Sequence, residues 1–241
     1  MTTINRAQVL ARLALELGSL GDARPTAKVA IARAIELMPG TDWVSLTVRS
    51  SRVSFLTLAA SHDVAEQADE LQYVLREGPC VQASTRGEWY LSSDVASDAR
   101  WPRWGPQAAA LGIGSLLSIQ LASNDEPLGA LNMYSSRAGA YSDRDEVDFA
   151  LLYGAHVAMS LTSAQELTGL HSAILTRHTI GVCQGMLMER YDLDRDASFT
   201  LLTRYAAELG RPLAEVAADI VAGHRLTVTA REPAAAASDR P

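Results

Sequence analysis

Apolar residues change their spacing several times along the first part of the chain. Residues 5–20 carry apolar side chains at helical intervals, and a second helix is predicted from Pro25 to just before Gly40. Alternation of apolar and polar residues then predicts strands at residues 43–49 and 53–58, separated by a short polar break. These two strands are expected to pair as a hairpin.

A second hairpin is predicted further along. Residues 63–76 return to helical spacing, and the runs 115–121 and 127–134 have the composition of strands. The intervening residues 124–126 (Asn-Asp-Glu) have turn chemistry. The order of these elements predicts an α+β fold, in which an antiparallel sheet is flanked by helices.

The remaining pattern is helical only. Ser142 is a suitable N-cap for a long linking helix, and an apolar stripe continues along this helix to Ile174. The stripe is broader than one sheet face can cover, so the helix from Asp143 to Ile174 is predicted to form a homodimer. Alternatively, the helix merely covers the first domain.

A small three-helix bundle is predicted over residues 177–223, with breaks at 192–194 and 210–212. In its first helix Gly181 and Gly185 lie one turn apart, although a glycine inside a helix costs up to about 1 kcal/mol relative to alanine. Two such residues on one face indicate close approach by another backbone. A neighbouring helix is the favoured explanation, and a nucleic acid is the alternative.

Composition limits the cellular setting and the partners. The net charge is −7 and Lys28 is the only lysine, so any contact with nucleic acid must come from a local patch of arginines. The two cysteines cannot form a disulfide framework. There is no apolar run that could cross a bilayer and no signal-peptide pattern at the start, so we expect a cytoplasmic protein without membrane contact.

Enzyme motifs are missing from the sequence. It contains no GK[ST] phosphate loop, no HExxH and no Gly-x-Ser-x-Gly elbow. His171 and His178 could share a helix face, but no carboxylate or cysteine completes a metal cluster there. We therefore expect a protein that is not an enzyme and that has no metal site and no cofactor.

The C-terminal helices resemble the ANTAR family of RNA-binding antiterminators. The resemblance rests on spaced positions in all three helices: Ile180-Gly181 through Gly185-Met-Leu-Met-Glu-Arg190, Ser198-Phe199 with Leu202 and Ala206, and Leu213 with Val216-Ala217 and Ile220-Val221. It implies a regulator of transcription that binds terminator-type RNA hairpins. The candidate RNA-binding residues are Gln184, where the family usually has lysine, Arg190, Arg204, Tyr205 as a stacking platform, and Arg211.

Charge leaves a second function open. Residues 165–225 contain six arginines and eight acidic residues, a net charge of −2. Because phosphate contacts dominate affinity for nucleic acid, the arginines would have to gather on one surface. The alternative is a dimeric signalling protein whose helical bundle docks a protein partner and no longer binds RNA.

The N-terminal part resembles a GAF domain, of the kind that precedes ANTAR modules in actinobacterial regulators. The residues that carry the resemblance are Glu77-Gly-Pro-Cys80, Asp98-Ala-Arg-Trp101-Pro-Arg-Trp104, Gly112-Ile-Gly-Ser-Leu116 and Leu128-Gly-Ala-Leu-Asn-Met-Tyr134. GAF domains often bind a small-molecule ligand, and Cys80, Trp101 and Trp104 are the candidate contacts. A small apolar role for Cys80 and core or lid roles for the tryptophans are the favoured alternatives.

The chain is thus predicted to have three parts. They are a GAF-like sensor domain at residues 1–160, a linking helix with an ANTAR-like three-helix domain at 161–225, and a disordered tail at 226–241.

Overall fold

The computed structural model describes residues 3–50, 54–86, 89–123 and 126–223. The turn predicted at residues 124–126 and the tail predicted at 226–241 therefore lie wholly or largely outside the described residues. The chain divides into two compact units, Met1–Thr168 and Gly169–Pro241, which are described separately below.

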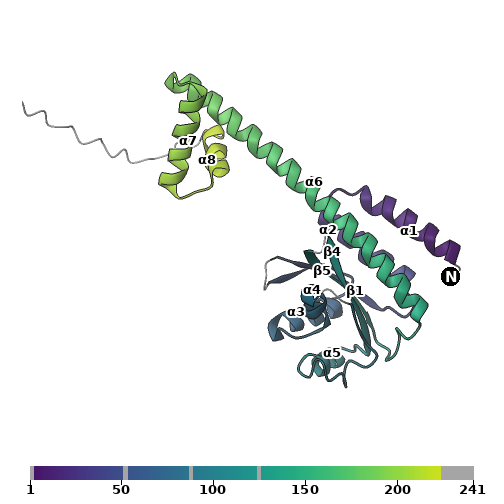
Figure 1. Ribbon diagram of the computed structural model, residues 1–241. Helices are drawn as coiled ribbons and strands as arrows, with labels where there is room; N and C mark the ends of the chain where they lie inside the picture. Colours follow the sequence, from purple (N-terminus) through teal and green to yellow (C-terminus); the bar gives the residue numbers. More distant parts are fainter. Residues whose placement is uncertain (1–2, 51–53, 87–88, 124–125, 224–241) are drawn as a thin grey trace, which may run out of the picture. The chain divides into compact units, whose positions relative to one another are not determined.

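The first unit contains a five-stranded antiparallel sheet (Figure 1). Its strands are β1 (Trp43–Arg49), β2 (Phe55–Ala60), β3 (Trp89–Ser92), β4 (Ser115–Ser123) and β5 (Glu126–Ser135), and the order across the sheet is β2-β1-β5-β4-β3. Strand β1 pairs with β2, and β4 pairs with β5, so both predicted hairpins are confirmed. The central strands β1 and β5 also pair and thereby join the hairpins.

In the described part of the chain, five helices precede the C-terminal helices: α1 (Thr3–Gly18), α2 (Ala23–Leu37), α3 (Asp63–Leu75), α4 (Pro79–Arg86) and α5 (Gly105–Ala110). The predicted start of α2 at Pro25 is wrong. The carboxylate of Asp22 accepts a hydrogen bond from the backbone N–H of Arg24 at 3.2 Å, so the helix begins at Ala23.

One face of the sheet is apolar. Alternate strand residues, including Leu46, Ile119 and Leu131, pack with α1, α2 and the first half of α6 (Arg144–Tyr191) in one core. Within α6, Gly154 lies against the sheet, because a Cβ there would be 2.8 Å from Cγ2 of Ile119. A glycine at this position lets the helix approach the sheet closely, because glycine has no Cβ.

The opposite face of the sheet carries small polar residues, yet it is also covered. Ser45, Thr47, Ser118 and Asn132 are fully buried there. Helices α3 and α4 pack over this face, α3 on β1 and β2, and α4 on β3, β4 and β5. The first unit therefore has an apolar layer on one side of its sheet and a buried layer with polar side chains on the other.

The second unit is a three-helix bundle. The end of α6 packs with α7 (Arg195–Leu209) and α8 (Leu213–Val221) around a small core that includes Cys183, Leu202 and Val216. The linking helix and the first helix of the bundle are one continuous element, α6, of 48 residues. It begins after Asp143, whose carboxylate accepts from the N–H of Asp145, and not after Ser142 as predicted.

Candidate functional site

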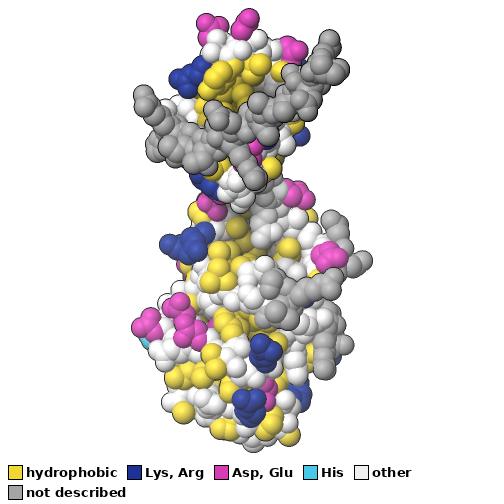
Figure 2. Space-filling view, turned by 90° about the vertical axis from the view of Figure 1, so that its left-hand side faces the viewer, with side chains coloured by type: hydrophobic (Ala, Val, Ile, Leu, Met, Phe, Trp, Pro, Cys, Tyr) yellow, Lys and Arg dark blue, Asp and Glu magenta, His cyan; other side chains and the backbone are white. Residues whose placement is uncertain are grey.

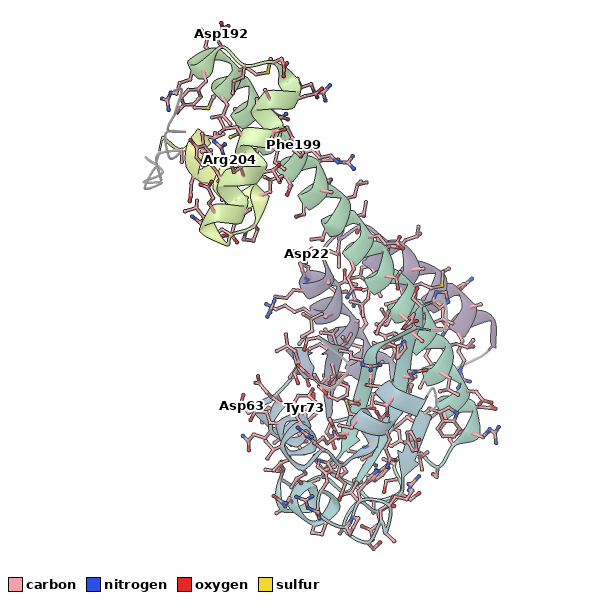
Figure 3. The ribbon with its side chains drawn as sticks, turned by 60° about the vertical axis from the view of Figure 1, so that its left-hand side comes forward. Asp22, Asp63, Tyr73, Asp192, Phe199 and Arg204 are labelled. Atoms are coloured by element: carbon pink, nitrogen blue, oxygen red, sulfur yellow. The ribbon has the colours of Figure 1, made fainter. Side chains whose placement is uncertain are left out.

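Arg204 and Tyr205 lie together in the helical unit. They line a groove of about 510 Å³ whose other walls are Tyr191, Leu193, Ala197, Thr200 and Leu201. Tyr191, the last residue of its helix, is 51% exposed. Figure 3 shows Arg204 on α7 and Asp192 in the turn that precedes this helix. The groove therefore presents an arginine and two aromatic rings.

Arg190 lines a different groove in the same unit. Its neighbours there are Val182, Gly185, Met186, Leu187, Glu189 and Ile220, and the groove has a volume of about 620 Å³. A Cβ built at Gly181 or Gly185 would meet nothing within 4 Å. The favoured explanation of these glycines, packing against a neighbouring helix, is therefore wrong within the described chain, and the face remains open.

The remaining predicted residues make contacts within the bundle. The guanidinium of Arg211 donates to Asp219 at 2.7 Å and to Glu215 at 3.3 Å, and these carboxylates raise its pKa. The side-chain amide of Gln184 donates to the carbonyl of Arg195 at 3.3 Å and so connects α6 to the start of α7. Of the predicted RNA-binding residues, only Arg204 and Tyr205 therefore line the same groove.

Of the two predicted arginines that form ion pairs, Arg204 is more accessible than Arg211. Its Nε lies 3.7 Å from the carboxylate of Glu208, one turn along α7, and its side chain is 65% exposed. Such an exposed pair contributes little and is screened by salt. The guanidinium can therefore exchange this partner for another anion or for the edge of a base.

In the first unit, the polar face of the sheet meets a buried carboxylate on α3. Oδ1 of Asp69 accepts from the hydroxyl of Tyr134 at 2.7 Å and from Nδ2 of Asn132 at 3.2 Å. Oδ2 accepts from Thr57 at 2.9 Å and from Thr47 at 3.3 Å. These four donors are neutral, and they come from β1, β2 and β5. The network connects helix α3 to three strands.

Burial raises the pKa of Asp69 from 3.8 to about 6, although hydrogen bonds from Tyr134 and the hydroxyl groups oppose the shift. Tyr73, also on α3 (Figure 3), bonds through its hydroxyl to Thr47 at 2.8 Å and to Thr57 at 2.9 Å. Burial followed by the charge of Asp69 raises the pKa of Tyr73 well above its usual value. The layer is thus a set of neutral donors around one carboxylate.

The pattern of residues along the chain does not predict this network. Asp69 lies inside a helix, and Thr47 and Asn132 occupy the polar positions of alternating strands, which normally face water. The one indication in the sequence is that these strand positions carry serine, threonine and asparagine and no charged residue. Such residues can be buried when their hydrogen bonds are satisfied.

Cys80, a candidate ligand contact, is the second residue of α4 and is fully buried. Its backbone N–H donates to Oε1 of Gln72 at 2.8 Å. Burial first, and then the charge of Asp69, raises the pKa of its thiol to about 12. The thiol is therefore protonated near neutral pH and is a weak nucleophile.

Trp101 and Trp104, the other two candidates, form part of a second apolar cluster beneath α3 and α5. Both are fully buried, and their rings meet edge to face with centroids 6.0 Å apart. The indole N–H of Trp104 donates to the carbonyl of Ala68 at 3.0 Å. The guanidinium of Arg100 lies 4.4 Å above the ring of Trp101. These contacts place both tryptophans in the core.

Two structural absences apply to the described part of the chain. Within it, no helix is both long and apolar enough to cross a membrane. The same residues include no group of three histidine, cysteine, aspartate or glutamate side chains that could hold a metal ion.

Two family models match the sequence in succession. The model of the GAF domain matches residues 22–162, and the model of the ANTAR domain matches residues 168–221. No curated protein matches the chain. The first match covers the unit that contains the sheet, and the second covers the bundle and the helix that enters it.

Solved structures with similar folds are distant in sequence. The GAF domain of a phosphoenolpyruvate-protein phosphotransferase from Coxiella burnetii is 16% identical with a TM-score of 0.55, over 70% of this chain and 99% of that one. Free methionine-R-sulfoxide reductase from Neisseria meningitidis is 14% identical with a TM-score of 0.53, over 67% and 90%. A bacteriophytochrome from R. palustris is 10% identical with a TM-score of 0.57, over 86% and 48%. At these identities the similarity concerns the fold alone.

Proposed function

The chain belongs to the GAF domain family and carries a C-terminal ANTAR domain, and on this premise we propose that it is a transcription antitermination regulator. In this proposal the ANTAR domain binds terminator-type RNA hairpins, and a small-molecule signal at the GAF domain controls that binding. The protein is not an enzyme in this scheme, it works in the cytoplasm, and it acts as a homodimer.

One observation carries the RNA-binding part of the proposal. The ANTAR match coincides with a folded three-helix unit that keeps Arg190 and Arg204 exposed instead of burying them in its core. Exposed arginines supply phosphate and base contacts in RNA recognition, and Tyr205 beside Arg204 supplies a ring. The bundle thus has the residue types that the proposed activity needs.

The test begins with RNA crosslinked to the protein in its native cells and then sequenced. The enriched hairpin is bound to purified full-length protein, and affinity is measured by fluorescence anisotropy. We expect affinity to fall roughly tenfold or more between about 50 and about 200 mM salt, because binding releases counterions from the RNA. A DNA hairpin of the same sequence serves as the control ligand.

Arg204→Ala should weaken RNA binding roughly fivefold or more. The matched control is Arg144→Ala, which removes an exposed arginine from the first unit, where Arg144 pairs with Asp148. If no RNA is enriched by crosslinking, and the purified protein binds hairpins no better than their DNA equivalents, the proposal fails.

A protein-docking bundle is the second candidate function, and one feature favours it. The groove around Gly185 is bordered by Val182 and Met186, each 38% exposed, in a segment with a net charge of −2 over residues 165–225. Figure 2 shows apolar side chains gathered on the surface of this unit, with charged residues around them. Docking through apolar contacts would depend little on salt, whereas RNA binding would depend on it steeply.

A further inference from the structure

The groove between the end of α6 and α7 combines rings, an apolar lining and a cation. Tyr191 is the last residue of α6, and Arg204 and Tyr205 are adjacent on α7. Leu193, Ala197 and Leu201 add apolar surface. Two of the chain's seven tyrosines thus line one groove, in a protein with an aromatic content of only 6%.

Tyr191 and Tyr205 are held differently in this groove. Tyr191 is 51% exposed. Tyr205 is half-buried and packs on one side against the core of the bundle. A half-buried ring supported by a core is a rigid platform, and an exposed ring at a helix end can adjust to a ligand. Together they offer π-surfaces in a groove of about 510 Å³, a volume within the usual range of small-molecule sites.

The polar groups of the groove suit the edge of a base. The guanidinium of Arg204 is exposed and can donate to ring nitrogens and carbonyl oxygens of a base. The hydroxyl of Thr200 already donates to the carbonyl of Asp196 at 2.9 Å, so its oxygen is left as an acceptor. The groove therefore provides both a donor and an acceptor next to aromatic surface.

The surrounding charge argues against a phosphate in the same place. Glu208 lies 3.7 Å from Arg204. Asp192, Asp194 and Asp196 are concentrated at the turn before α7 and in its first residues. The carboxylate of Asp194 accepts from the N–H of Ala197, a residue of the groove itself, at 2.7 Å. A neutral base avoids the repulsion that these carboxylates would exert on a phosphate.

We propose that this groove receives one unpaired base of the RNA loop, stacked against Tyr191 and Tyr205 with Arg204 at its edge. The inference rests on the proposed RNA-binding function and deepens it. It adds Tyr191 and Thr200 to the recognition site. It also gives the groove the role of reading a base, while phosphate contacts are made elsewhere on the RNA.

The probe is a library of RNA stem-loops with a constant stem and a randomised loop, from which the full-length protein selects a tight binder. This stem-loop is then synthesised with each loop base in turn replaced by an abasic site. We expect one abasic position to weaken binding roughly 5- to 100-fold, as the loss of one base–aromatic stack does. Dissociation constants are measured by fluorescence anisotropy.

The decisive comparison is a double-mutant cycle with Tyr191→Leu. This variant should weaken binding of the intact stem-loop by a similar factor, yet bind the abasic stem-loop as well as the wild-type protein does. Phe199→Leu is the matched control, because Phe199 is an exposed aromatic residue on α7 (44%) that does not line the groove. It should leave the effect of the abasic site unchanged. Circular dichroism confirms that both variants are folded.

Two different failures can be distinguished. If Tyr191→Leu weakens intact and abasic stem-loops equally, or weakens neither, no base occupies the groove and this inference is overturned, although RNA binding stands. If the wild-type protein selects no stem-loop from the library, the proposed function fails and the inference fails with it. A Tyr205→Leu variant would remove the second ring. If it unfolds the bundle, Tyr191→Leu still tests whether a base occupies the groove, because Tyr191 is exposed.

Discussion

At the scale of single residues, the buried carboxylate of Asp69 is the most unusual group in the first unit. It is fully buried, and its hydrogen-bond donors are hydroxyl and amide groups without charge. The titratable groups around it are Tyr73, Tyr134 and Cys80, whose pKa values burial raises. They remain neutral between pH 5 and 7, so only Asp69 in this network titrates there.

The first prediction follows from the sign of this pKa shift. The pKa of Asp69 is raised from 3.8 to about 6, so its stabilising effect is complete below pH 3.8 and is lost as the pH rises through 6. Between pH 5 and 7 this loss amounts to about 1 kcal/mol. Urea unfolding of wild type and Asp69→Asn at both pH values measures the difference. Equal pH slopes in the two proteins would show that Asp69 does not titrate in this range.

The second prediction concerns Cys80, whose thiol is buried and protonated. In native Cys183→Ser protein we expect Cys80 to react with a maleimide only as fast as the first unit unfolds, and rapidly in urea. Cys80→Ala should lower the free energy of unfolding by about 1 kcal/mol and leave the response to any ligand of the first unit intact. Fast labelling of the native protein would contradict the burial of the thiol, and loss of the ligand response in folded Cys80→Ala protein would assign the thiol a sensing role.

At the scale of elements, the bundle segment of α6 combines a buried face with an open one. Cys183 and Leu187 are buried against α7 and α8, whereas Gly181 and Gly185 face open space. An exposed glycine weakens a helix without improving any contact in the chain itself. The pair therefore reduces the stability of the bundle, and a surface that another molecule approaches closely is a reason to keep it.

The third prediction separates stability from binding at these glycines. Gly181→Ala and Gly185→Ala should each raise the free energy of unfolding of the bundle by up to about 1 kcal/mol, since the added methyl groups meet nothing within 4 Å. If RNA or a protein approaches this face, one of the variants should bind it less tightly despite the greater stability. Thermal unfolding and anisotropy measure the two effects. Lower stability would mean that the face is covered in the free protein.

At the scale of the whole molecule, helix α6 supplies residues to both compact units. Apolar side chains remain exposed on one side of this helix: Leu152, Met159, Leu167, Leu170 and Ile174, which are between 43% and 67% exposed. They follow one another at spacings of seven, eight, three and four residues, which keeps them on one helical face. An exposed apolar stripe of this kind is typical of a helix that pairs with a second copy.

The fourth prediction is a homodimer formed through this face of α6. Light scattering over a wide concentration range should give twice the mass of the chain, and Leu170→Glu should reduce it to the monomer mass, because a charge on a buried stripe is costly. Ser172→Glu, which places the same charge on the opposite side of the helix, should remain dimeric. A wild-type protein that is monomeric at every concentration contradicts the prediction.

The sequence alone determined most of the elements and both families, because these depend on local spacing. The alternation in β1, β2, β4 and β5 and the helical spacing after Ser142 can be recognised from consecutive residues alone. The ANTAR positions, such as Gly185 and Ala217, can be recognised in the same way. So can the helix break at residues 192–194, where the carboxylate of Asp194 caps α7.

Only the tertiary structure decided which polar positions are buried and how tightly each arginine is paired. Thr47 and Asn132 look like solvent-facing strand residues until α3 covers them and brings Asp69 to within hydrogen-bonding distance. Arg204 and Arg211 look equivalent in the sequence, but α8 places two carboxylates against Arg211 and leaves Arg204 beside Tyr205. Both outcomes depend on which faces of distant segments meet, and periodicity within one segment carries no information about that.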